Sequence, residues 1–66
     1  MTVQQAIQEI KSVNKAYLQI DKPMTQAYFS DMCKRAESGH LKPDTLRAFL
    51  ERFGYSLNIE LNAEKK

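Results

Sequence analysis

The chain has 66 residues, a formal net charge of +2 and 42% hydrophobic residues, which limits it to one small domain with a modest core. Its single cysteine, Cys33, excludes an intrachain disulfide, and one cysteine with one histidine, His40, excludes a closed zinc site. Domains of this size are often reinforced by a disulfide, a metal or a second subunit, so self-association is the reinforcement that we expect.

The short apolar runs, of two or three residues at most, predict no membrane-spanning segment. No signal-peptide pattern opens the chain, and a lone cysteine suits a reducing compartment, so we expect a cytoplasmic protein. Residues 1–62 are predicted to form one small helical domain, and residues 63–66 a disordered tail.

The first predicted helix spans residues 2–19. Thr2 can cap it, and Gln5 three residues later completes a capping-box pattern. Apolar residues recur at steps of three and four from Val3 to Ile20, which indicates one apolar face. This face has two interpretations. The favoured one is packing inside the monomer core; the alternative is a helix–helix seam with a second subunit, in which Asn14 would set the register.

Two further helices are predicted, at residues 25–38 and 43–53. Thr25 is a suitable N-cap for the first, and Gly39 can take the positive φ that ends it. Pro43 has its φ preset for the first turn of the next helix. Helical periodicity assigns these residues to the core: Phe29, Met32, Cys33, Ala36, Leu46, Phe49, Leu50 and Phe53.

The last predicted element is a strand with period two. Tyr55, Leu57, Ile59 and Leu61 alternate with polar residues, which is typical of a half-buried strand. A single strand leaves its backbone groups unpaired, so we expect it to pair with the same strand of a second copy. The predicted fold is therefore mainly α: three helices and a short C-terminal β-strand that pairs across a homodimer, with these four apolar residues at the interface.

The segment from Glu37 to Leu61, with Gly39, Lys42-Pro43 and Phe53-Gly54-Tyr55, resembles the second half of the lambda-repressor-like (Cro/phage repressor) helix-turn-helix domain. Several antitoxins of that class dimerise through a strand after the last helix, so the resemblance implies a DNA-binding regulator and, for an antitoxin, a toxin as protein partner. Upstream, one uninterrupted helix stands where the family has two short ones. The motif is then either shortened or assembled from the first two helices.

The second helix carries the predicted DNA contacts. Gln26, Ser30 and Lys34 face outward, and short polar residues can reach base edges while basic ones meet phosphates. Asp31 lies on the same stripe and would repel the DNA backbone. An ordinary solvated helix face is the alternative interpretation. The complete predicted nucleic-acid interface is Gln26, Ser30, Lys34, Arg35, His40 and Lys42.

No cluster of residues predicts a reaction, a cofactor or a metal. His40 lacks a partner at a recognisable spacing and is expected in a surface turn, while Cys33 is expected in the core. We therefore expect a protein that is not an enzyme. Two functions remain: a small dimeric DNA-binding regulator, and a protein-binding adaptor or inhibitor that uses an apolar face or a strand edge.

Overall fold

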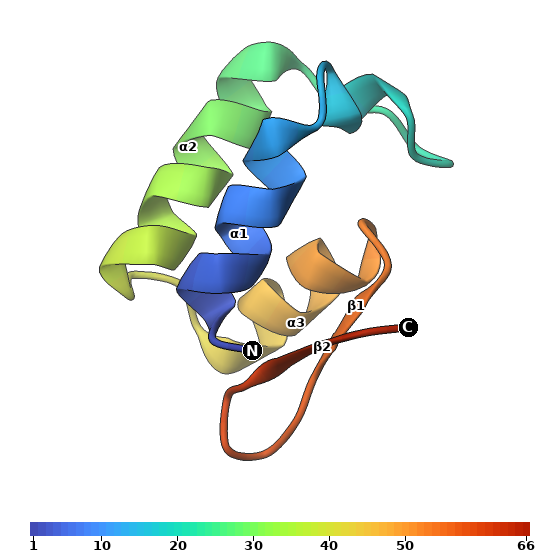
Figure 1. Ribbon diagram of the computed structural model, residues 1–66. Coiled ribbons are helices and arrows are strands. Elements are labelled where there is room, and N and C mark those ends of the chain that lie inside the picture. The colour runs from blue at the N-terminus through green and yellow to red at the C-terminus, as the bar shows by residue number, and fades with distance from the viewer.

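The computed structural model describes residues 1–66 and shows a mainly helical fold with a C-terminal hairpin (Figure 1). This confirms the predicted class of a three-helix domain with a short β-element at its C-terminal end. The elements, in chain order, are α1 (Val3–Ser12), the 3-10 helix η1 (Ala16–Leu18), α2 (Gln26–Ser38), α3 (Pro43–Glu51), β1 (Tyr55–Leu57) and β2 (Ala63–Lys65). None of the helices has the length and the apolar character that crossing a membrane requires.

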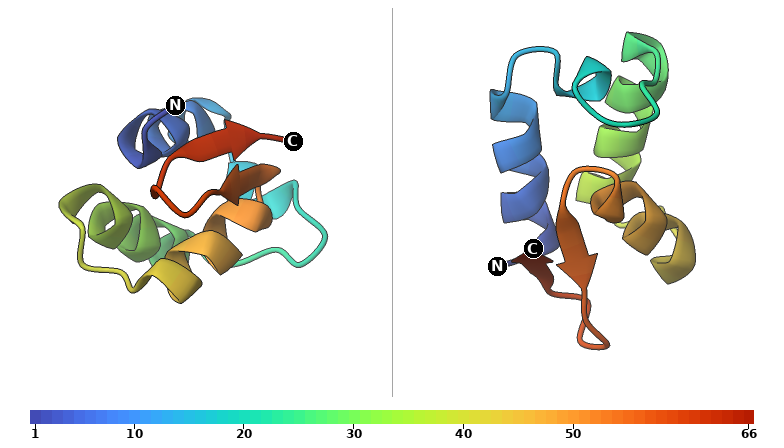
Figure 2. Two further views of the ribbon diagram at one scale, coloured as in Figure 1. Left: turned by 90° about the horizontal axis from the view of Figure 1, so that it is seen from below. Right: turned by 90° about the vertical axis from the view of Figure 1, so that its right-hand side faces the viewer.

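The helices and the hairpin surround one core. Helices α1 and α2 pack against each other and run in opposite directions, as Figure 1 and the right-hand view of Figure 2 show. The hairpin lies between α1 and α3, with β1 packed on α3 and β2 packed on α1. The core therefore sits between the three helices and the inner side of the hairpin.

The N-terminus pairs with β2. The amino group of Met1 donates to the carbonyl of Ala63 at 3.0 Å, and the Ala63 N–H donates to the carbonyl of Met1 at 2.8 Å. An isolated antiparallel bridge between Thr2 and Asn62 extends this contact. The first residues of the chain thus cover the edge of β2 that β1 leaves open.

Helix α1 is shorter than predicted. The capping box is present, since Gln5 N–H donates to Thr2 Oγ1 at 3.1 Å and Thr2 N–H donates to Gln5 Oε1 at 2.9 Å. The helix nevertheless ends at Ser12, whose hydroxyl donates to the Glu9 carbonyl, and Lys15 adopts a left-handed backbone with φ 54°. Residues 12–14 are Ser, Val and Asn, which are weak helix formers: Ser and Asn favour local side-chain hydrogen bonds, and Val is β-branched. The prediction of one helix over 2–19 is wrong beyond residue 12.

The predicted bounds of α2 and α3 agree with the structure within two residues. Thr25 caps α2 by accepting from the Tyr28 N–H at 3.1 Å, and Gly39 ends it with φ 77°. Pro43 opens α3, and Gly54, with φ 86°, follows its last turn. These four signals act within one turn of the chain, which is why the sequence located them.

The prediction of one continuous strand at residues 55–62 is wrong, because this segment contains a short strand and a turn. Only Tyr55–Leu57 is extended, and residues 58–62 form the turn of a hairpin whose second strand is Ala63–Lys65. Asn58 organises the turn, because its Oδ1 accepts the N–H groups of Glu60 and Asn62, each at 3.0 Å. Leu61 takes a left-handed backbone with φ 61°. Asn is common in turns because its side chain can replace a backbone acceptor.

Two further predictions about the C-terminal segment are also wrong. Residues 63–65 are a paired strand, so the expectation of a disordered tail at 63–66 is wrong. The four predicted interface residues do not share one face, since Tyr55 and Leu57 are 5% and 7% exposed whereas Ile59 and Leu61 are 94% and 46% exposed. Strand β1 finds its partner inside the same chain. The structure therefore removes the backbone argument for pairing with a second copy.

The centre of the core is a group of four aromatic rings. Phe29 of α2 lies 5.3 Å from Tyr17, 6.4 Å from Phe49 and 5.6 Å from Phe53, measured between ring centroids, and all pairs are tilted. Phe49 and Phe53 are 5.1 Å apart. Tilted aromatic pairs at these separations stabilise a core beyond the area they bury. On α1, Ala6, Ile7 and Ile10 are buried in the same cluster, which confirms that its apolar face belongs to the monomer core.

We expect Phe49→Ala to lower the free energy of unfolding by about 3–5 kcal/mol, because the ring is 2% exposed and contacts two other rings. In a domain of this size such a loss approaches the total stability. Urea unfolding followed by circular dichroism measures it. Phe53→Ala is the control and should cost less, since Phe53 is only partly buried. Equal, small effects of both substitutions would contradict this description of the core.

The hairpin places Leu57 in the core and Ile59 in solvent, and a matched pair of lysine substitutions tests this difference. Leu57→Lys should unfold the domain, because it places a charge in the core without a partner. Ile59→Lys should change the free energy of unfolding by no more than about 0.5 kcal/mol, because that side chain lies in solvent. Thermal melts of the two variants compare these outcomes directly. If Ile59→Lys unfolded the domain, the result would contradict the hairpin and support one continuous strand with Ile59 on its buried face.

Candidate functional site

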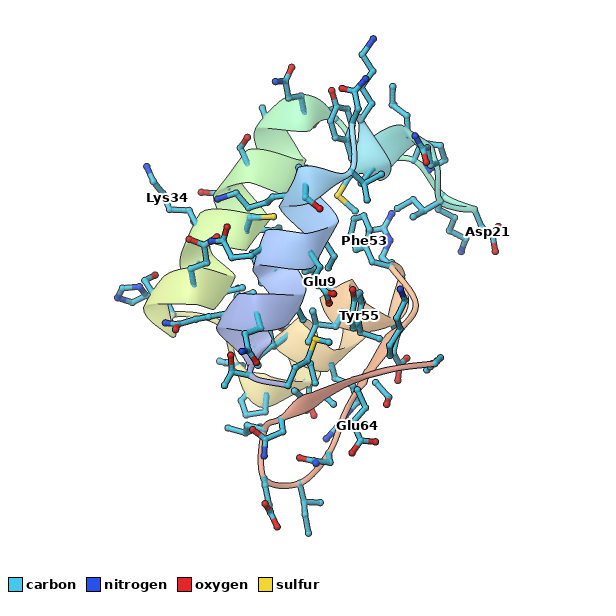
Figure 3. The ribbon with its side chains drawn as sticks, viewed as in Figure 1. Glu9, Asp21, Lys34, Phe53, Tyr55 and Glu64 are labelled. Atoms are coloured by element: carbon cyan, nitrogen blue, oxygen red, sulfur yellow. The ribbon has the colours of Figure 1, made fainter.

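The outward face of α2 carries the side chains that the sequence assigned to DNA. Gln26, Ser30 and Lys34 are all exposed, and Figure 3 shows Lys34 pointing away from the body of the protein. The opposite side of the helix is held in the core by Phe29, Met32, Cys33 and Ala36. The three polar residues follow one another at steps of four, so they form one stripe along the helix. From Gln26 to Lys34 this stripe rises by about 12 Å.

Two charged side chains flank that stripe. The Nε of Arg35 lies 3.1 Å from Oδ2 of Asp31, one helical turn away, and both side chains are about half exposed. The pair has the acidic residue N-terminal to the basic one, which is the more favourable order in a helix. Arg35 is therefore near the predicted interface but is engaged by a carboxylate of the same face.

His40 and Lys42 lie in the turn that follows α2, and both are exposed. The Ser38 hydroxyl donates to the Lys34 carbonyl at 2.9 Å, and its oxygen lies 2.6 Å from Nδ1 of His40. This short contact ties the His40 ring to the last turn of α2. The structure confirms a surface turn histidine. Lys42 is the N-cap residue of α3 and makes no side-chain cap.

The structure brings Lys34, Arg35, His40 and Lys42 to one end of α2, with Gln26 at the other. These residues thus share α2 and the turn that follows it, but the basic side chains lie together at the C-terminal end of the helix. The face is elongated, with polar residues at one end and basic ones at the other.

Helices α2 and α3 are joined by four residues, 39–42, a connection length that helix-turn-helix motifs also have. Helices α1 and α2 are separated by residues 13–25 and lie antiparallel, an arrangement that does not fit a helix-turn-helix built from these two helices. In α3, Asp44 lies 3.6 Å from Arg47 and Glu51 is also exposed, which leaves no excess of positive charge. Of α2 and α3, only α2 is followed by a turn with further basic residues, His40 and Lys42.

A contact that the sequence did not reveal fixes α2 against α1. The Glu37 carboxylate accepts from Lys11 Nζ at 3.0 Å and from Gln8 Nε2 at 3.4 Å. Gln4 Nε2 also donates to the Glu37 carbonyl at 3.3 Å. The step of four between the two glutamines placed them on one polar side of α1, but it could not identify a residue on α2 as their partner.

A groove of about 690 Å³ lies between the C-terminal end of α1, the loop after η1 and the turn from α3 to β1. Its apolar lining comes from Ile10, Val13, Ala16, Ile20 and Phe53. In its wall the Tyr55 hydroxyl donates to Oε2 of Glu9 at 3.0 Å, and Figure 3 shows these two side chains turned toward each other. Burial, followed by the bond to Glu9, raises the pKa of Tyr55. The residues are 46 positions apart, so no sequence pattern links them.

Comparison of the chain with protein-family models, with curated proteins and with solved structures finds no match.

Cys33 lies in the core behind the outward face of α2, 2% exposed, as the sequence predicted. Burial raises the pKa of its thiol from 9.0 to about 11; Lys11 nearby lowers it and Glu37 raises it by smaller amounts. At pH 9 an ordinary thiol of pKa 9.0 is half ionised, whereas only about 1% of the Cys33 thiol is. The thiolate is the reactive form.

We therefore expect Cys33 to react with a thiol reagent at least about tenfold more slowly in the native protein than in urea at pH 9. Because the folded pKa lies above the unfolded one, the free energy of unfolding should also fall as the pH rises from 9 toward 11. Absorbance kinetics and pH-dependent urea unfolding measure the two effects. Equal labelling rates in both states would contradict the buried position.

Proposed function

We propose that the protein is a small, non-enzymatic DNA-binding regulator of the cytoplasm, repressor-like or antitoxin-like, which places the outward face of α2 on duplex DNA as a homodimer. One observation carries the proposal. Gln26, Ser30 and Lys34 form an exposed stripe on a helix whose other side is fixed in the core. Gln can bind adenine with two hydrogen bonds in the major groove, and Lys can neutralise phosphate.

The homodimer is proposed on different grounds from those of the sequence. With β1 paired inside the chain, the reason is that one α2 face offers few phosphate contacts, and affinity for DNA rises steeply with their number. Two copies related by a two-fold axis would double them. Such copies engage successive major grooves when their helices lie about 34 Å apart.

A protein-binding adaptor or inhibitor is the second candidate, and a separate observation favours it. Ile59 and Leu61 expose apolar side chains in the turn of the hairpin, Ile59 almost completely. Apolar side chains exposed together are a feature of protein interaction sites. A partner protein, such as the toxin of an antitoxin-like pair, would bury them without any contact to nucleic acid.

Gel-shift titrations test the DNA proposal. Lys34→Ala should weaken binding to all duplexes alike and reduce the slope of log affinity against log salt by about 0.9, because one phosphate contact is lost. Gln26→Ala should cost about 1–3 kcal/mol on the preferred duplex, selected from a random pool, and little on others. Light scattering on each protein without DNA should give the mass of two chains.

Lys66→Ala is the matched control, since it removes one positive charge at the far end of the hairpin and should leave DNA binding nearly unchanged. No gel shift at low salt for the wild-type protein would contradict the DNA proposal. Binding to a protein partner that is lost in Ile59→Lys and that is insensitive to salt would then support the second candidate.

A further inference from the structure

The most informative charge on the outward face of α2 is a negative one. Asp31 follows Ser30 directly and lies three residues before Lys34, so it belongs to the same exposed surface. Its Oδ2 is 3.1 Å from Nε of Arg35, and both side chains remain about half exposed. The other carboxylate of the helix, Glu37, is bound to Lys11 of α1. Asp31 is therefore the acidic group of α2 that approaching DNA would meet.

We propose that Asp31 sets an upper limit on the affinity of this face for DNA, by repelling phosphate beside Lys34 and by holding the guanidinium of Arg35 away from it. This inference rests on the proposed function and adds a residue that regulates the strength of the same contact. In it, Gln26, Ser30 and Lys34 make the contact, and the pair of Asp31 and Arg35 determines how much positive charge accompanies it.

The geometry explains both effects. On a helical projection, Asp31 and Lys34 differ by about 60° around the axis, so a phosphate within reach of Lys34 also lies near the Asp31 carboxylate. A hydrogen bond to a charged group is stronger than one between neutral groups, and Asp31 occupies the Nε donor of Arg35. Without the carboxylate, the exposed charge of the three residues Asp31, Lys34 and Arg35 changes from one positive charge to two.

The proposed test is Asp31→Asn, which removes the charge but keeps the size of the side chain and its capacity to accept a hydrogen bond. If the substitution both ends the repulsion of phosphate by Asp31 and frees Arg35, the gain should equal at most one phosphate contact: affinity for every duplex should rise by up to about tenfold at 0.1 M salt, and the slope of log affinity against log salt should steepen by up to about 0.9. The melting temperature should fall by no more than about 2–4 °C, because a helical ion pair of this spacing is weak.

Asp44→Asn is the matched control. Asp44 also forms a short-range helical ion pair, with Arg47 at 3.6 Å, and its substitution changes the net charge by the same amount. A gain that arises only from net charge would appear equally in both variants and would overturn the inference. A gain confined to Asp31→Asn supports it.

Arg35→Gln completes the test as a double-mutant cycle. In the wild-type background this substitution should weaken DNA binding by less than it does in the Asp31→Asn background, because Asp31 engages Arg35 in the wild-type protein. In the Asp31→Asn background it should remove most of the gain. Wild-type binding with no gain in Asp31→Asn would overturn this inference alone, whereas no binding by either protein would overturn the proposed function with it.

Discussion

The packing of Phe29 against three other rings is the constraint on which the rest of the molecule depends. Tyr17 approaches it from η1, and Phe49 and Phe53 approach it from α3 and the turn that follows. Because these rings come from three separate segments, one contact group fixes the rotation of α2 about its own axis. That rotation decides which residues of α2 remain in solvent, so the candidate interface is a consequence of the core.

A second constraint closes the fold at its other end. Strand β2 pairs with β1 on one edge and with Met1 and Thr2 on the other, which ties the two ends of a 66-residue chain together. Ala63, at the centre of this arrangement, is fully buried. Small domains have little core to spare, and an isolated two-stranded hairpin is marginal in water. Here the hairpin is stabilised by α1 and α3, and in return it covers their inner sides.

The elements that the sequence predicted well are those with local signals. Thr25, Gly39 and Pro43 cap or terminate helices through contacts within a few residues, so their effect can be read without the fold. The outward face of α2 follows from helical periodicity alone. The ion pair of Asp31 and Arg35 has the i,i+4 spacing of helical neighbours, so this contact also follows from the sequence.

The remaining features depend on contacts between distant residues or on local chemistry that imitates another pattern. The apolar pattern continues beyond the end of α1 because η1 packs on the same core. The pattern therefore predicts a longer helix than the one that forms. Asn58 and Asn62 occupy positions that suit the solvent side of a strand, yet Asn58 organises a turn. Residues 63–65 show no strand pattern and become a strand only by pairing with β1 and the N-terminus.

Charge distribution gives the final argument about function. Lys11, Arg35 and Arg47 each lie in an ion pair. The other basic side chains are spread over the segment between α1 and α2, over α2 and its following turn, over the end of α3 and over the hairpin. Apart from the group at the C-terminal end of α2, no part of the surface collects them, although a committed DNA-binding surface concentrates positive charge. For the proposed DNA complex, such a surface favours a dimer that uses few, well-placed contacts. The proposed effect of Asp31 acts in the same direction, because a carboxylate repels any phosphate but leaves hydrogen bonds to the correct bases in place.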